Sequence, residues 1–132
     1  MAKTPIPETA ALQFVQSPQS QFLALIAIPS CNEFQNLPAV IQSLEINKPE
    51  LVSKTLVTIN VNNRSNVENT DNLKTLEWIK SYDGHVKLAF LNSSEKPFSF
   101  SEKFGVGLAR HQAVMSSIDY IDRFHCGPKK PC

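Results

Sequence analysis

Residues 22–33 constrain the fold more than any other stretch, because an unbroken apolar run meets an abrupt polar elbow there. Residues 22–28 are seven apolar residues without alternation, a pattern typical of a strand covered on both faces. We therefore expect this strand in the middle of a sheet. Pro29 cannot donate to a ladder and should end the pairing. Residues 30–33 would then stand at the carboxyl end of a central strand, where open α/β sheets bind their ligands.

Length and composition limit the class of protein. A chain of 132 residues suits one domain that buries roughly two-thirds of its unfolded surface. Hydrophobic residues make up 42%, charged residues 19%, and the net charge is +1, which argues against disorder and against a nucleic-acid partner. No apolar run approaches the roughly 18 residues of a membrane span, and residues 1–20 lack the pattern of a signal peptide. We expect a cytoplasmic protein without a membrane span.

Apolar periodicity divides the rest of the chain into alternating helices and strands. Strands are predicted over 55–61 and 86–91, and helices over about 37–47, over 71–82 and from Gly105 onward. The buried side of the last helix should carry Val114, Ile118 and Ile121. This alternation predicts the α/β class, with a mainly parallel sheet and helices on both faces.

The ends of the chain and one long loop lack a clear period. Residues 1–21 contain three prolines and are predicted to form an irregular arm, residues 22–124 the α/β domain, and residues 125–132 a flexible tail. In that tail His125, Cys126 and Cys132 could supply three zinc ligands, but no fourth ligand has a recognisable spacing. Residues 92–103 are too long for a tight connection and suggest either a ligand lid or a surface loop.

Three polar clusters, at residues 29–33, 62–65 and 105–110, should meet at one edge of the predicted sheet. Each cluster alone has a simpler interpretation. The first could only cap a helix, the second could be a turn that tolerates left-handed backbone, and Arg110 could be a surface charge. Their convergence is what would make a site.

With these motifs the chain resembles the amino-terminal half of the GT-A-fold family 2 glycosyltransferases, which bind a nucleotide-diphosphate sugar. Residues 26–33 (IAIPSCNE) match the family's pattern of two hydrophobic residues, Pro, Thr or Ser, any residue, Asn and Glu. Residues 57–65 match its strand that ends in an Asp-rich turn with Ser, and residues 105–111 match its Gly-x-x-x-Ala-Arg-Asn. The resemblance covers residues 22–122 and implies an incomplete GT-A fold.

The resemblance also implies roles for particular side chains. Residues of the elbow would contact the base and ribose of a UDP-type nucleotide, and Asn62 stands where the family has an Asp that accepts a hydrogen bond from the uracil ring. Arg110 would lie near the diphosphate, reinforced by the positive end of its helix. The implied nucleotide-sugar contacts are Pro29, Ser30, Asn32, Glu33, Asn62, Asn63, Ser65 and Arg110.

The chain departs from the family where catalysis is concerned. A complete member would hold Mg²⁺ or Mn²⁺ on an Asp-x-Asp after the last helix, but Asp119 and Asp122 are predicted to lie on that helix. We therefore expect no metal and no sugar transfer from this chain alone, as in a truncated or degenerate relative. A non-catalytic α/β binding or assembly module is the alternative, and a flavodoxin-like regulator is disfavoured because no phosphate loop follows the first strand. A sheet edge exposed by missing strands could mediate self-association.

Overall fold

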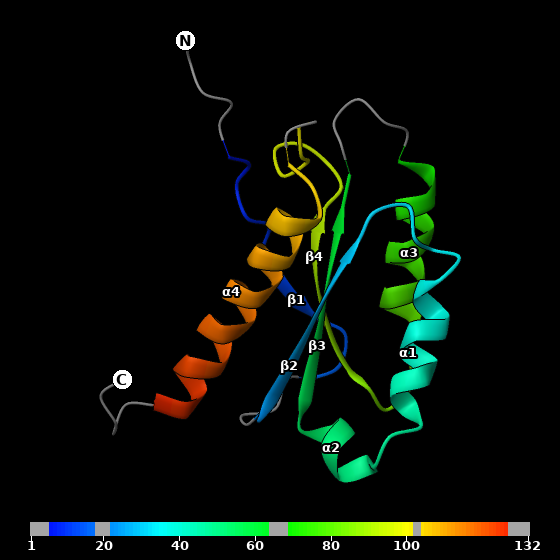
Figure 1. The fold of residues 1–132 in the computed structure, drawn as a ribbon, viewed down its shortest axis with the longest axis vertical. Helices are drawn as coiled ribbons and strands as arrows, with labels where there is room; N and C mark the ends of the chain where they lie inside the picture. The colour runs from blue at the N-terminus through cyan, green and yellow to red at the C-terminus, as the bar shows by residue number, and fades with distance from the viewer. Residues whose placement is uncertain (1–5, 18–21, 64–68, 102–103, 127–132) are drawn as a thin grey trace.

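The computed structural model describes residues 6–17, 22–63, 69–101 and 104–126. It has the predicted α/β class, with α4 on one face of the sheet and α1 and α3 on the other (Figure 1). The elements in chain order are β1 (Leu12–Phe14), β2 (Ala24–Ser30), α1 (Leu37–Glu45), α2 (Pro49–Ser53), β3 (Thr55–Asn62), α3 (Thr70–Ser81), β4 (Lys87–Ser93) and α4 (Val106–Cys126).

The four strands form one mixed sheet in the order β1-β4-β3-β2. The pairs β2–β3 and β3–β4 are parallel and β1–β4 is antiparallel. The central position expected for β2 is wrong, because β3 and β4 occupy the centre of the described sheet. An apolar run indicates that both faces of a strand are buried, but it does not indicate whether the strand has a neighbour on one side or on both. Pairing also continues past Pro29 to Ser30, since an edge strand accommodates proline where the missing N–H faces away from its partner.

The amino-terminal segment was predicted to be an irregular arm, but part of it forms a strand. Leu12–Phe14 pairs with β4, Leu12 opposite Leu91, and Ala10 is buried. The Gln16 side chain extends this contact: its Nε2 donates to the Val86 carbonyl (2.8 Å) and its Oε1 accepts from the Leu88 N–H (2.9 Å). A three-residue strand is too short to show a period of two.

The two faces of β3 differ in polarity. Val57, Ile59 and Val61 face the main apolar core with α1 and α3. The alternate residues face α4, where Thr58 and Ser117 share a hydrogen bond (2.6 Å) and the Asn60 Nδ2 donates to the Ala109 carbonyl (3.1 Å). On this face the side chains become more polar toward the carboxyl end of the strand, where the candidate site lies.

The buried side of α4 differs from the predicted one. Small or polar residues face the sheet, among them Ala109, Ala113 and Ser117, while Ile118 is 40% exposed. Small side chains at a spacing of four let the helix lie close to the sheet. Of the three residues predicted to be buried, Val114 is partly buried and Ile121 packs against the cluster of Phe22 and Tyr120, so the prediction is wrong only for Ile118. α4 also continues through Cys126, so the predicted tail starts too early; residues 127–132 lie outside the described part.

Two other local predictions are corrected. The apolar spacing within residues 71–82 predicts Leu73 on the buried side of that helix, but Leu73 is exposed, whereas Asn72 and Thr75 are buried there. The loop after β4 is not a simple lid or surface loop, because Phe100 is fully buried and its N–H donates to the Asn63 carbonyl (2.8 Å). In the described part of the chain, no helix combines the length and hydrophobicity needed to cross a bilayer.

The two tyrosines of the chain, Tyr82 and Tyr120, give a prediction for alkaline pH. Burial raises the pKa of both above the ordinary 10.0, although the Val86 N–H that donates to the Tyr82 hydroxyl (3.2 Å) opposes the shift there. Because the pKa of each tyrosine is higher in the folded than in the unfolded chain, the protonated tyrosines favour the folded state. This contribution to the free energy of unfolding is complete below pH 10 and is lost as the pH rises through the folded pKa. A tyrosinate absorbance titration should show higher midpoints in the native protein than in urea, and equal midpoints would contradict the burial.

Candidate functional site

A cavity of about 240 Å³ lies at the carboxyl ends of β2 and β3, beside the start of α4. It is lined by residues from three separate parts of the chain, which are Pro29, Cys31, Glu33, Asn62, Gly105 and Val106. The parallel pairing of β2 with β3 brings the first two parts together, and the packing of α4 on both strands adds the third. Three of the predicted contact residues, Pro29, Glu33 and Asn62, therefore line one cavity.

Asn62 is held with its amide in one orientation. Its Nδ2 donates to the Ser30 carbonyl (3.2 Å) and to the Asn60 carbonyl (3.1 Å). Both partners are carbonyl oxygens, which only accept, so the nitrogen must point at them. Neither bond uses Oδ1, and that oxygen remains an acceptor on a side chain that is itself nearly buried. Asn62 thus lines the cavity with its amide held in place by two backbone contacts.

The start of α3 fixes the elbow that follows β2. The fully buried Asn72 accepts from the Asn32 N–H (2.9 Å) and donates to the Asn62 carbonyl (3.2 Å) and to the Asn63 Oδ1 (3.1 Å). The neighbouring Asp71 carboxylate accepts from the Phe34 N–H (3.1 Å). The Asn72 amide therefore ties together the ends of two strands.

Sequence reasoning missed Asn72 because amphipathic periodicity searches for apolar residues. The sequence did contain one signal that position 72 is buried. Residues 72, 75, 76 and 79 follow helical spacing, so a polar residue at position 72 falls on the buried side of the helix. A buried polar side chain needs partners, and the nearest unsatisfied backbone groups are those at the strand ends.

The elbow itself adopts a turn that its residues tolerate. Asn32 has φ of 55°, in the left-handed region that asparagine enters more readily than most residues. Its side chain is exposed and does not line the cavity. Glu33 organises the start of α1 instead: its carbonyl accepts from two backbone N–H groups, and its carboxylate accepts from the Asn36 Nδ2 (2.9 Å). Helix capping by Ser30 or Asn32, the simpler interpretation of these residues, is not what the structure contains.

The remaining predicted contacts lie near the cavity without lining it. Ser30 and Asn63 are buried, and Asn63 is occupied with backbone contacts to Ser93 and Phe100 (3.3 and 2.8 Å). Arg110 is exposed on α4, one turn beyond the lining residue Val106. Ser65 lies outside the described residues.

Buried polar atoms without a partner gather at this end of the described structure. They are found where β2, β3 and β4 end, in the loop after β4 and in the first turns of α3 and α4, and comprise Ser30 Oγ, Asn60 Oδ1, Asn69 Oδ1, Ser93 Oγ, Ser101 Oγ and Gln112 Nε2. Native proteins rarely leave such atoms unsatisfied, and functional sites are one place where they do. Their concentration marks the carboxyl edge of the sheet as the polar end of the molecule.

The described residues do not fit a divalent metal. No group of three His, Cys, Asp or Glu side chains is close enough among them to hold an ion. Among the described residues, Glu33 is the one carboxylate that lines the cavity, and its Oε2 already accepts from Asn36. Asp119 is engaged on the outside of α4 by Arg123 (3.3 Å). No chemical step through a metal is therefore assigned to these residues.

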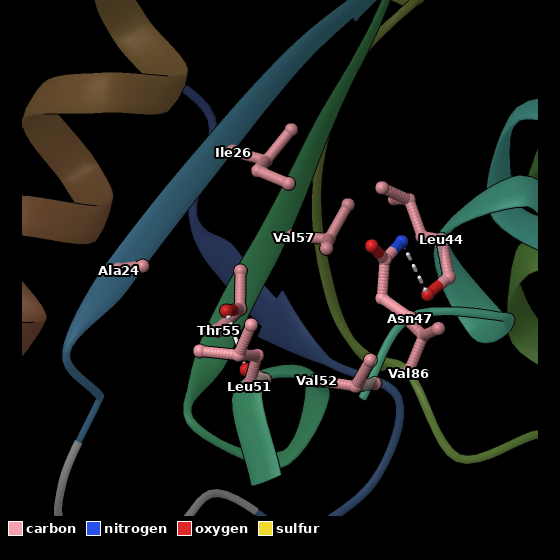
Figure 2. A pocket seen from close by; sticks show the side chains of 9 residues that line it. All are labelled: Ala24, Ile26, Leu44, Asn47, Leu51, Val52, Thr55, Val57 and Val86. Atoms are coloured by element: carbon pink, nitrogen blue, oxygen red, sulfur yellow. Dashed lines mark hydrogen bonds between the residues drawn. The ribbon is translucent and has the colours of Figure 1, made fainter. Parts of the chain in front are cut away.

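A larger cavity of about 340 Å³ opens at the opposite, amino-terminal end of β2 and β3 (Figure 2). β2 and β3 form one wall, with Ala24, Ile26 and Val57, and the end of α1 with α2 forms the other. Its polar side chains are occupied locally, since Asn47 donates to the Leu44 carbonyl (3.2 Å) and Thr55 to the Leu51 carbonyl (2.7 Å). This cavity offers mainly methyl surface and lacks the converging polar groups of the first.

Comparisons with known proteins add no assignment. No protein-family model matches the chain, and no curated protein or solved structure matches it either. The candidate site is therefore assigned from its geometry and chemistry alone.

Proposed function

We propose that this chain is a glycosyltransferase-like domain that binds a nucleotide-diphosphate sugar, UDP-type, in the cavity at the carboxyl ends of β2 and β3. One observation carries the proposal. Three segments that resemble separate motifs of the family 2 enzymes contribute lining residues to the same cavity, although more than 70 residues separate the first from the last.

The chemistry of the cavity suits the nucleoside part of such a ligand. The Asn62 Oδ1 is a fixed acceptor, and the uracil ring offers an N–H donor. The Pro29 ring adds an apolar wall. At about 240 Å³ the cavity is smaller than the roughly 300–1,000 Å³ of sites that enclose a whole drug-sized ligand. We therefore assign it to the base and ribose, with the rest of the ligand extending outward.

The diphosphate would lie against the start of α4. The first N–H groups of a helix have no partner inside the helix and carry partial positive charge, which favours phosphate. Val106 lines the cavity at this point, and a Cβ added at Gly107 would meet no described residue within 4 Å beyond its own helix turn and chain neighbours, so a ligand can approach the backbone closely. Arg110, one turn further along, would extend its guanidinium to the distal phosphate or sugar.

The proposal stops at binding. Without a group of His, Cys, Asp or Glu among the described residues that could hold a metal ion, we propose that sugar transfer needs groups beyond the described residues. A non-catalytic assembly module is the second candidate, and the unpaired edge of β2 is the observation that favours it. We also propose a cytoplasmic location, which cell fractionation would test.

Calorimetric titration with UDP tests the proposed site. Val106 is largely exposed at the rim of the cavity, so Val106→Trp should block the cavity without disturbing the core. We expect UDP to bind the unchanged chain and the variant to bind about tenfold or more weakly. Ile46→Trp provides the matched control, because Ile46 is also an exposed apolar residue but does not line this cavity.

CDP is the ligand control for the same titration. Its cytosine ring has an acceptor where uracil has the N–H, so it should bind about 2- to 10-fold more weakly than UDP if the Asn62 Oδ1 reads the base. Absence of heat with millimolar UDP would refute the proposal. Equal losses in Val106→Trp and Ile46→Trp would refute the location.

A further inference from the structure

Among the described residues, the outer edge of β2 has no strand partner and little protection. Among the described residues β2 pairs only with β3, so one edge of this seven-residue strand presents backbone N–H and C=O groups. Natural sheets guard such edges with charges, bulges or prolines. Residues 22–30 contain no charged side chain, and Pro29 is the one protective residue, placed near the carboxyl end.

The apolar stripe of α4 lies beside this edge. Val114, Ile118 and Ile121 follow helical spacing, yet Ile118 is 40% exposed and Met115 beside it is 51% exposed. The stripe lies on the side of α4 next to β2, because Ile118 and Ile121 line a cavity of about 160 Å³ together with residues 22–25; Asp122 is the one charged residue among the described residues that line it. Leu23, also in that lining, is 70% exposed. Apolar surface therefore continues from the helix onto the strand edge.

The opposite face of the same edge is also hollow. The cavity of about 340 Å³ in Figure 2 is lined by Ala24 and Ile26 of β2, on the face that carries α1 and α2. Successive side chains of a strand point to opposite faces of a sheet. A strand added along β2 would thus place alternate side chains into the two cavities while its backbone satisfied the free edge.

We propose that this β2–α4 surface, consisting of residues 22–30 with Met115, Ile118 and Ile121, binds a second copy of the chain through antiparallel β2–β2 pairing about a two-fold axis. Such an interface is isologous, so it needs a self-complementary patch, and an uncharged apolar strand meets this requirement. A net charge of +1 adds little repulsion between copies.

The position of α4 is compatible with that symmetry. α4 packs on both β2 and β3, and neighbouring strands lie about 4.8 Å apart. Pairing the two β2 strands would therefore bring the two α4 helices to about 10 Å from each other, the upper end of the distance at which helices pack. Their exposed apolar stripes would then face one another across the axis.

Sedimentation equilibrium over a range of concentrations tests this interface. We expect a dimer of twice the 14.7 kDa chain mass. Leu23→Lys and Ile118→Lys each place a charge in the paired surface and should weaken dimerisation about tenfold or more. Val40→Lys is the matched control, because Val40 on α1 is 42% exposed, close to the 40% of Ile118, and lines neither cavity.

Three outcomes would overturn the proposal. These are a monomer at every concentration, a dimer that both lysine variants leave intact, and open-ended assembly beyond the dimer. Circular dichroism should give the same helix content for all three lysine variants, since each replaces an exposed side chain. UDP titration of Leu23→Lys separates this proposal from the proposed function, because nucleotide affinity should be unchanged when dimerisation is lost.

Discussion

Replacing Asn72 with alanine is expected to lower the free energy of unfolding by about 3 kcal/mol, a large part of the 5–15 kcal/mol typical of a domain. The substitution removes one acceptor and two donors from a fully buried position. It leaves the Asn62 carbonyl and the Asn63 Oδ1 without these partners and releases the Asn32 N–H. Each buried polar group that loses its partner costs about 1–3 kcal/mol.

Urea unfolding followed by the fluorescence of Trp78 measures this effect, since Trp78 is the single tryptophan and packs on Tyr82 (5.6 Å between ring centroids) within the same region. Leu73→Ala is the control, because Leu73 is the next residue on α3 and is exposed. Its loss should stay below about 1 kcal/mol. If Asn72→Ala cost no more than Leu73→Ala, the amide would not be the tie between the strand ends.

Replacing Phe100 with alanine should lower the free energy of unfolding by about 3–5 kcal/mol, the usual cost of deleting a buried phenylalanine. Phe100 is among the largest side chains that are fully buried, and its N–H donates to the Asn63 carbonyl beside the candidate site. A lid that only covers a ligand would not carry such a cost, because surface substitutions usually stay within about 0.5 kcal/mol.

Phe98 offers the matched control for this second experiment. It belongs to the same loop, has the same side chain and is only half-buried. Phe98→Ala should therefore destabilise the protein clearly less than Phe100→Ala in the same urea titration. If both variants were within about 0.5 kcal/mol of the unchanged chain, the loop would be a surface element after all.

Much of the fold could be predicted from local patterns. β3 is β-branched and apolar, and residues 71–82 have a clear amphipathic period, so both elements were found within about one residue of their ends. The α/β class followed from the alternation of helices and strands and is confirmed. α1 carries Pro38 in its first turn, where the missing N–H costs no helical hydrogen bond.

The failed predictions all depended on tertiary contacts. The apolar run of β2 looked central because α4 and the α1–α2 side cover its faces, while its outer edge stays unpaired. Ile118 looked buried because hydrophobic periodicity does not weigh the closer approach that Ala109 and Ala113 allow. β1 and α2 are too short for any periodicity to reveal them.

Several residues that line the candidate site were predicted, but the residue that holds the strand ends together was not. Convergence of strand ends was enough to bring Pro29, Glu33 and Asn62 together, because parallel neighbours end at the same edge of a sheet. The contribution of Asn72 could not be found in that way. Its role depends on where α3 crosses the strand ends, and that crossing is set by core packing far from the site.

The polarity difference between the two faces of β3 has a consequence for how the chain reaches its native alignment. If β3 slipped by one residue, Thr58 and Asn60 would enter the main apolar core, and Ile59 would face the polar groups of α4. Purely apolar central strands can tolerate such slippage, whereas this one cannot. Thr58 and Asn60 therefore disfavour a misaligned pairing of β3 while the sheet forms.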